Sequence, residues 1–71
     1  MDLVQLLGRN VRRLRKERGL SQEQLALDAD MKRTYVSDME RGTRNPSVKA
    51  IERIARALGV PASQLLEEGD L

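Results

Sequence analysis

Glycines divide this chain into short segments, and within each segment the apolar residues recur every three or four positions. Gly19, Gly42 and Gly59 each follow one such segment, and a glycine just beyond the last helical residue is a common way for a helix to end. In the first segment the apolar residues are Leu3, Leu7, Val11 and Leu14. This spacing is that of amphipathic helices, whereas strands would show strict alternation. The chain is therefore expected to be all-α.

Five helices are expected. They are about residues 2–18, about 22–29, a helix within 32–45 that ends at Arg41, and two helices within 47–68. Ser21 and Gln24 have the spacing of a capping box, which places the start of the second helix. Either Pro46 at the first helical position or Ser47 as the cap begins the fourth helix, and Pro61 begins the fifth. The sequence thus predicts a compact five-helix bundle.

The size and composition of the chain allow one small core. A length of 71 residues fits a single domain over residues 1–71. Because there are no cysteines, neither a disulfide nor a thiolate zinc site can support the fold, which must depend on apolar packing within one subunit or between two. No apolar run reaches the roughly 20 residues that cross a bilayer, and the first residues do not resemble a signal peptide. A cytoplasmic protein without membrane contact is expected.

Enzymatic chemistry is not expected from this sequence. It has no histidine or cysteine, no phosphate-binding glycine loop and no carboxylate cluster with an evident partner. We therefore predict no catalytic residues, no metal, no cofactor and, because the helices use the whole chain, no small-molecule ligand.

The charge is unevenly distributed. The chain has 13 basic and 11 acidic residues, but Glu67, Glu68 and Asp70 fall within the last five positions, so residues 1–66 carry 13 basic and 8 acidic groups, a net charge of +5. Such a basic body is compatible with a polyanionic partner. Solubility alone is an equally good explanation at this point.

The third expected helix has two distinct faces. On a helical wheel the polar residues within an arc of roughly 140° are Arg33, Thr34, Ser37, Asp38 and Arg41. Tyr35, Val36 and Met39 lie on the other side. The polar face is either simply solvated or used for binding. A capped helix and a brief turn at Asp30 and Met31 precede it, which is the spacing of a helix-turn-helix, whose second helix enters the major groove of DNA.

The stretch RKERGLSQEQLALDADMKRTYVSDMERGTRNPSVKAIERIARALGV, residues 15–60, resembles the phage-repressor-type helix-turn-helix family, also called the xenobiotic-response-element family of bacterial regulators. GLSQEQLA, RTYVSDMERG, RNPS and ALGV all fall in register. The resemblance implies a lambda-repressor-like bundle of about five helices, with the helix-turn-helix at about residues 21–41. The run RTYVSDMERGTRN is most similar to the controller proteins of restriction-modification systems. Cro-like phage repressors and antitoxins are the alternatives.

The resemblance also implies roles for individual residues. The positions that would contact bases are Arg33, Thr34, Ser37 and Asp38. Arg33 suits guanine O6 and N7, and Thr34 suits a thymine methyl. Asp38 either accepts from cytosine N4 or orients a neighbouring arginine, Arg33 or Arg41.

Phosphate contacts are implied for a second set of residues, which are Gln22, Lys32, Tyr35, Arg41, Arg44 and Asn45. These contacts would fix the register on DNA without carrying sequence information. Tyr35 either contacts the DNA backbone through its hydroxyl or only packs its ring against the core.

Arg15 and Glu40 match family positions that form a salt bridge between the first and third helices. Two positions depart from the family pattern. Asp30 stands where glycine is frequent, and aspartate tolerates a left-handed backbone better than most residues. Lys32 stands where a small capping residue is frequent, so either the third helix starts without a cap or Asp30 caps it.

A homodimer is expected, because one helix reads too few base pairs to find a single site in a genome. Two such helices about 34 to 36 Å apart would read a palindromic operator. The apolar residues proposed for the dimer interface are Val60, Leu65, Leu66 and Leu71; the alternative is that they only close the core. RNA polymerase is a further partner of a regulator bound at a promoter. A protein-interaction module is the main alternative to DNA binding.

Overall fold

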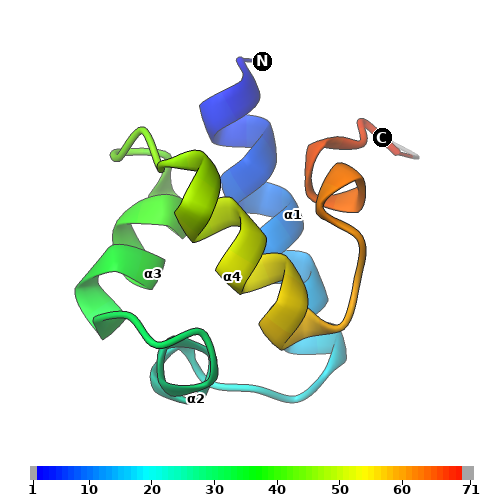
Figure 1. Cartoon of the computed structure of the whole chain (residues 1–71). Helices are drawn as coiled ribbons and strands as arrows, with labels where there is room; N and C mark the ends of the chain where they lie inside the picture. Colours follow the sequence, from blue (N-terminus) through cyan, green and yellow to red (C-terminus); the bar gives the residue numbers. More distant parts are fainter. Residues whose placement is uncertain (1, 70–71) are drawn as a thin grey trace.

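The computed structural model describes residues 2–69 and confirms an all-α fold, with no strand in that range (Figure 1). Its elements are α1 (Leu3–Glu17), α2 (Gln22–Asp28), α3 (Arg33–Arg41), α4 (Val48–Leu58) and η1 (Ala62–Leu66). The expectation of five α-helices was wrong for the last one, because η1 is a 3₁₀ helix of 5 residues. Tight 3₁₀ turns are used in short pieces, and here Pro61 precedes the segment and extended backbone follows it at Glu67.

Side-chain and glycine caps set most helix ends. Ser21 and Gln24 form the expected capping box at the start of α2. Ser47, rather than Pro46, caps α4, because its hydroxyl accepts from the Ala50 N–H at 3.0 Å. Gly42 ends α3 with a left-handed backbone, φ 73°, which glycine adopts at little cost.

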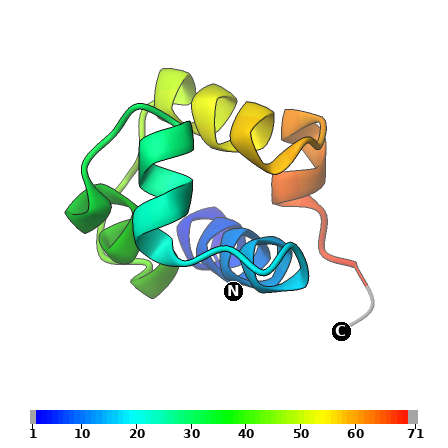
Figure 2. The same cartoon turned by 90° about the horizontal axis from the view of Figure 1, so that it is seen from below.

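α1 forms the centre of the bundle. In Figures 1 and 2 it lies between α3 and η1, while α4 packs across it and α2 closes one end. The core residues on α1 are Leu6, Leu7, Val11 and Leu14. Leu3 was expected on the apolar face of this helix together with Leu7, Val11 and Leu14. This was wrong, because Leu3 is 64% exposed. The first turn of α1 projects beyond the neighbouring helices (Figure 1), so Leu6 enters the core instead.

A glycine lets α1 and α3 approach each other closely. Gly8 is buried, and a Cβ built on it would lie 2.3 Å from the Met39 carbonyl oxygen and 2.9 Å from that of Glu40. No side chain fits at such distances, so Gly8 sets the spacing of the two helices.

The C-terminal segment is fastened to the other side of α1. Leu65 is fully buried in the core, and the Asn10 side-chain amide donates to the Leu65 carbonyl at 2.7 Å and to the Glu67 carbonyl at 2.9 Å. Among the described residues, Asn10 is the one polar residue that is buried over its backbone and side chain together. It satisfies backbone groups that η1 cannot pair internally. Within residues 2–69, no helix is long and apolar enough to cross a membrane.

Candidate nucleic-acid interface

α2 and α3 are joined by a tight turn. The Met31 N–H donates to the Ala26 carbonyl at 2.9 Å, and Asp30 adopts a left-handed backbone with φ 56°. The half-buried Met31 packs against the core. Asp30 therefore adopts the left-handed backbone at the position where glycine is frequent in the family, as expected. α3 begins after Lys32 without any side-chain cap, so the alternative in which Asp30 caps the helix was wrong.

The polar residues expected on one face of α3 do lie together on its outer side. Val36 and Met39 are buried beneath them. Arg33, Thr34 and Arg41 are exposed, and Ser37 and Asp38 are half-buried. The periodicity thus placed this face correctly, and α3 itself lies next to α2 (Figure 1).

The donors at the N-terminal end of this face are unengaged. Lys32, Arg33 and Thr34 make no side-chain hydrogen bond or ion pair with another described residue. The Arg33 guanidinium carries five N–H donors in a planar fork, and all of them remain available to a ligand.

The C-terminal end of the same face carries a network around Asp38. Arg41 Nη2 donates to Asp38 Oδ1 at 2.5 Å, and Arg44 Nη2 donates to Oδ2 at 3.4 Å. The hydrogen bond from Arg41 lowers the pKa of the Asp38 carboxyl below its ordinary value of 3.8, and Arg44 contributes further. Of the two expected arginine partners of Asp38, Arg41 is therefore engaged, while Arg33 is not.

Tyr35 links α3 to the start of α4. Its half-buried ring packs against the core, and the Arg44 guanidinium lies 4.4 Å from the ring centroid. Its hydroxyl oxygen accepts from the Ser47 N–H at 3.2 Å. The hydroxyl hydrogen remains available as a donor.

Arg15 and Glu40 form a mostly buried ion pair between α1 and α3. Arg15 Nε donates to Glu40 Oε2 at 2.6 Å and Nη2 donates to Oε1 at 3.1 Å, while Nη1 donates to the Leu20 carbonyl at 2.8 Å. Gln22 Nε2 donates to Glu40 Oε1 at 3.0 Å. The amide of Gln22 is thus oriented by Glu40, and its second N–H is left for another acceptor. This tie between Gln22 and Glu40 was not anticipated from the sequence.

The remaining residues expected at phosphates lie at the ends of α3. Arg44 and Asn45 are exposed in the connection to α4, and Lys32 is exposed at the other end of the helix. Together with Gln22 they flank the polar face.

The residues proposed for a dimer interface have different environments. Leu65 offers no surface to a partner because it is fully buried in its own chain, so this assignment was wrong. Val60 is half-buried and Leu66 is 39% exposed. Leu71 lies outside the described residues.

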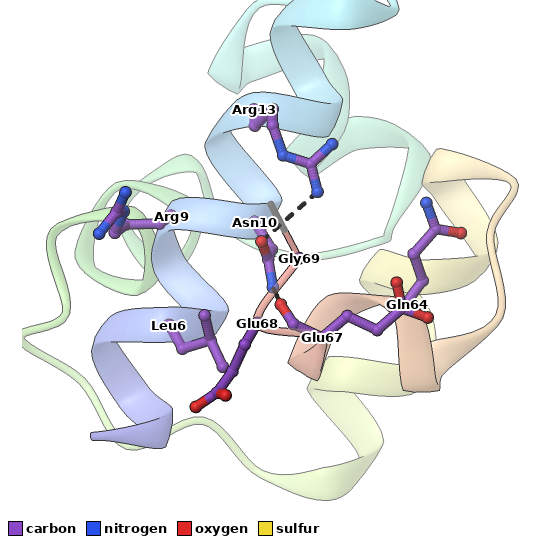
Figure 3. A pocket seen from close by; sticks show the side chains of 8 residues that line it. All are labelled: Leu6, Arg9, Asn10, Arg13, Gln64, Glu67, Glu68 and Gly69. Atoms are coloured by element: carbon purple, nitrogen blue, oxygen red, sulfur yellow. Dashed lines mark hydrogen bonds between the residues drawn. The ribbon is translucent and has the colours of Figure 1, made fainter. Parts of the chain in front are cut away.

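A hollow of about 460 Å³ lies between α1 and the C-terminal segment (Figure 3). Arg9, Asn10 and Arg13 line one side, and Gln64, Glu67 and Glu68 line the other. Arg13 is already engaged with Glu17 at 3.3 Å and with Asn10 Oδ1 at 3.4 Å. Residues 2–69 contain no group of three or more side chains suited to a metal ion.

Comparison with known proteins agrees with this geometry. The family described as Helix-turn-helix matches residues 11–65. The chain is 51% identical over 63 residues to control protein C.BamHI of Bacillus amyloliquefaciens, covering 87% of this chain and 78% of that protein.

Two solved structures illustrate the similarity of fold. Restriction-modification controller protein C.AhdI from Aeromonas hydrophila has a TM-score of 0.85 at 40% identity, over 87% of this chain and 94% of that one. The hypothetical transcription factor NHTF from Neisseria has a TM-score of 0.90 at 47% identity, over 93% and 76%. The chain therefore belongs to the helix-turn-helix family of DNA-binding transcriptional regulators.

Proposed function

We propose that this protein binds a palindromic DNA operator as a homodimer, with α3 in the major groove, and that it controls a restriction-modification locus. The relatives named as control or controller proteins, C.BamHI and C.AhdI, support this assignment. The similarity to C.AhdI extends over 94% of the solved chain of that protein.

The observation that carries the proposal is the unengaged donor set at the start of α3. Arg33 is exposed and has no partner among the described residues, and it stands on a helix whose opposite face is buried. A bidentate arginine contact to guanine discriminates against the wrong base by about 1 to 3 kcal/mol. Thr34 and Ser37 lie on the same face and are the further candidates for base contacts.

Phosphate contacts would come from residues at both ends of α3. Lys32 and Asn45 are exposed and have no side-chain partner among residues 2–69. Gln22 has one amide hydrogen free while Glu40 holds the other, and Tyr35 keeps its hydroxyl hydrogen. Such contacts fix the position of the helix on the duplex.

Dimerisation would use the exposed apolar surface of the C-terminal segment, where Val60 and Leu66 remain accessible. Two α3 helices about 34 to 36 Å apart would reach half-sites one helical turn apart. A bound dimer would then be the species that RNA polymerase meets at a promoter. Sedimentation that showed only monomer at high micromolar concentration would contradict the dimer.

The first experiment is selection from a random duplex library with wild-type protein, Arg33→Ala and Arg13→Ala. Arg13 is the matched control, because it is an exposed arginine that lines the hollow beside the C-terminal segment. We expect wild type and Arg13→Ala to enrich the same palindrome. Arg33→Ala should lose its preference at one base pair in each half-site, at a cost of about 1 to 3 kcal/mol.

A salt series separates DNA binding from the alternative, a protein-interaction module of the antitoxin type. The logarithm of the affinity should fall linearly with the logarithm of salt concentration, with a slope of about 0.9 per phosphate contact. If no duplex is enriched, or if binding is insensitive to salt, the proposal is wrong and the polar face of α3 serves a protein partner.

A further inference from the structure

We infer that Asp38 does not read a base but limits the positive charge that α3 presents to DNA, by holding Arg41 and Arg44, and so keeps non-specific affinity low. Asp38 is then a positioning residue that sets sequence discrimination indirectly. This inference rests on the proposed DNA-binding function.

Both carboxylate oxygens of Asp38 are already occupied. Oδ1 accepts from Arg41 and Oδ2 from Arg44. Each oxygen keeps a second lone pair, so a cytosine N4 group would have to share an oxygen that already accepts from a guanidinium group. Hydrogen bonds to charged donors are roughly twice as strong as neutral ones, so the two arginines are the stronger partners and leave the carboxylate a weaker acceptor for a base.

Arg44 is also held in place from a second direction. The Arg44 guanidinium stacks on the Tyr35 ring at 4.4 Å, and the Tyr35 hydroxyl is fixed by the Ser47 N–H. The Asp38 main-chain carbonyl accepts from both the N–H and the hydroxyl of Thr43, at 3.0 and 3.2 Å. The end of α3 and the connection to α4 therefore form one hydrogen-bonded unit with Asp38 at its centre.

The charge of this unit differs from that of the other end of α3. One carboxylate is shared by two guanidinium groups, so the net charge of these three side chains is +1, whereas Lys32 and Arg33 at the other end of α3 together carry +2 with no ion-pair partner among the described residues. Any duplex attracts positive charge through its phosphates, whatever its sequence. Reducing charge at Arg41 and Arg44 weakens binding to all duplexes, while the free Arg33 is kept for reading a base.

Discrimination depends on the ratio of operator affinity to non-specific affinity. Because Arg41 and Arg44 are paired with Asp38, they are less available to the phosphates of any duplex, and the affinity for non-specific DNA is lowered relative to that for the operator. Asp38 thus improves the search for one site without touching a base.

The test compares wild type, Asp38→Asn and Glu17→Gln. Glu17 is the matched control, because it is an exposed carboxylate paired with an arginine, Arg13, away from α3. Binding is measured to the operator found by library selection and to an unrelated duplex, each over a salt series. The melting temperature of each variant shows that it is folded.

For Asp38→Asn we expect the non-specific affinity to rise roughly three- to tenfold at low salt, as removal of one nearby charge implies, and the salt slope to steepen by up to about 0.9. The base preferences in the library should be unchanged. Glu17→Gln should match wild type. With Arg41 and Arg44 both replaced by alanine, the further change Asp38→Asn should have a much smaller effect, because Asp38 acts through them.

Loss of preference at one base pair in Asp38→Asn would show that Asp38 reads a base and would overturn the inference. An unchanged or reduced non-specific affinity would also overturn it. If wild type binds no duplex at all, the proposed function and this inference are both wrong. In the two outcomes above, by contrast, wild type binds DNA and only the role given to Asp38 is wrong.

Discussion

α3 and η1 lie on different sides of α1, and they are held by different kinds of contact. α3 depends on particular side chains, since the Arg15 guanidinium meets the Glu40 carboxylate and Gly8 makes room for the α3 backbone. η1 is held by one leucine in the core and by the Asn10 amide, which bonds main-chain carbonyls. The position of the DNA-reading helix is thus specified residue by residue, whereas the C-terminal segment is held largely through its backbone.

This difference has an energetic consequence. A buried charge that loses its partner is costly, and two backbones in contact cannot accept an added methyl group. Of the two carbonyls that Asn10 holds, that of Glu67 is only part-buried and can turn to water when it loses its donor. The α1–α3 contact should therefore be the more sensitive of the two to substitution.

The largest effect is expected for Arg15→Ala. The side chains of Arg15 and Glu40 are only 11% and 4% exposed, and removing one partner of a buried pair costs about 3 to 5 kcal/mol. Arg13→Ala is the control, because its pair with Glu17 is half exposed and such pairs contribute about 0 to 1 kcal/mol. Urea unfolding measures both. Equal stabilities would contradict the structural role of the Arg15–Glu40 pair.

The next effect is expected for Gly8→Ala. The new Cβ would meet the Met39 carbonyl oxygen at 2.3 Å, so α1 and α3 must separate. Overpacking of this kind costs about 1 to 3 kcal/mol, and each kcal/mol lowers the melting temperature of a domain of this size by about 4 to 8 °C. Lys16→Ala on the exposed face of α1 should change the melting temperature by very little. A Gly8→Ala variant as stable as wild type would show that the helices can shift freely.

A smaller effect is expected for Asn10→Ala. The Leu65 and Glu67 carbonyls lose their donor, at a cost of about 1 to 2 kcal/mol. Hydrogen exchange should become faster in residues 61–69 and stay unchanged in α3, and dimerisation should weaken. If α3 exchanged faster to the same extent, the two sides of α1 would not be independent.

The smallest effect is expected for the pH dependence of the stability that Asp38 contributes. Because the pKa of Asp38 is lowered in the folded chain, its ionised form favours folding, and this contribution is present above the ordinary pKa of 3.8 and is lost as pH falls through the lower folded value. The stability difference between wild type and Asp38→Asn should be constant from pH 5 to 8 and shrink below about pH 4. A difference that changed between pH 5 and 8 would contradict this assignment.

Local features of the sequence predicted most of the fold. The capping box of α2, the glycine ends of α3 and α4 and the two faces of α3 depend on residues within a few positions of one another, so their patterns are visible in the chain. The 3₁₀ geometry of η1 and the exposure of Leu3 depend on where neighbouring helices end, which no local pattern reports.

Contacts between distant residues were predicted only where the family resemblance supplied them, as for Arg15 and Glu40. The bond from Asn10 to residue 65 spans 55 positions, and the close approach at Gly8 depends on how α1 crosses α3. For Asp38 the sequence left two roles open, because only the folded connection to α4 brings Arg44 to its second oxygen.

The way Asn10 holds the C-terminal segment affects how such proteins can diverge. Since the amide recognises carbonyl groups that every residue possesses, and Leu65 alone enters the core from η1, the exposed side chains of residues 60–69 can change without loss of the fold. With dimerisation through this segment as proposed above, related regulators that share one cell can acquire separate pairing preferences through these side chains, and each would assemble with its own copies while α3 stays as it is.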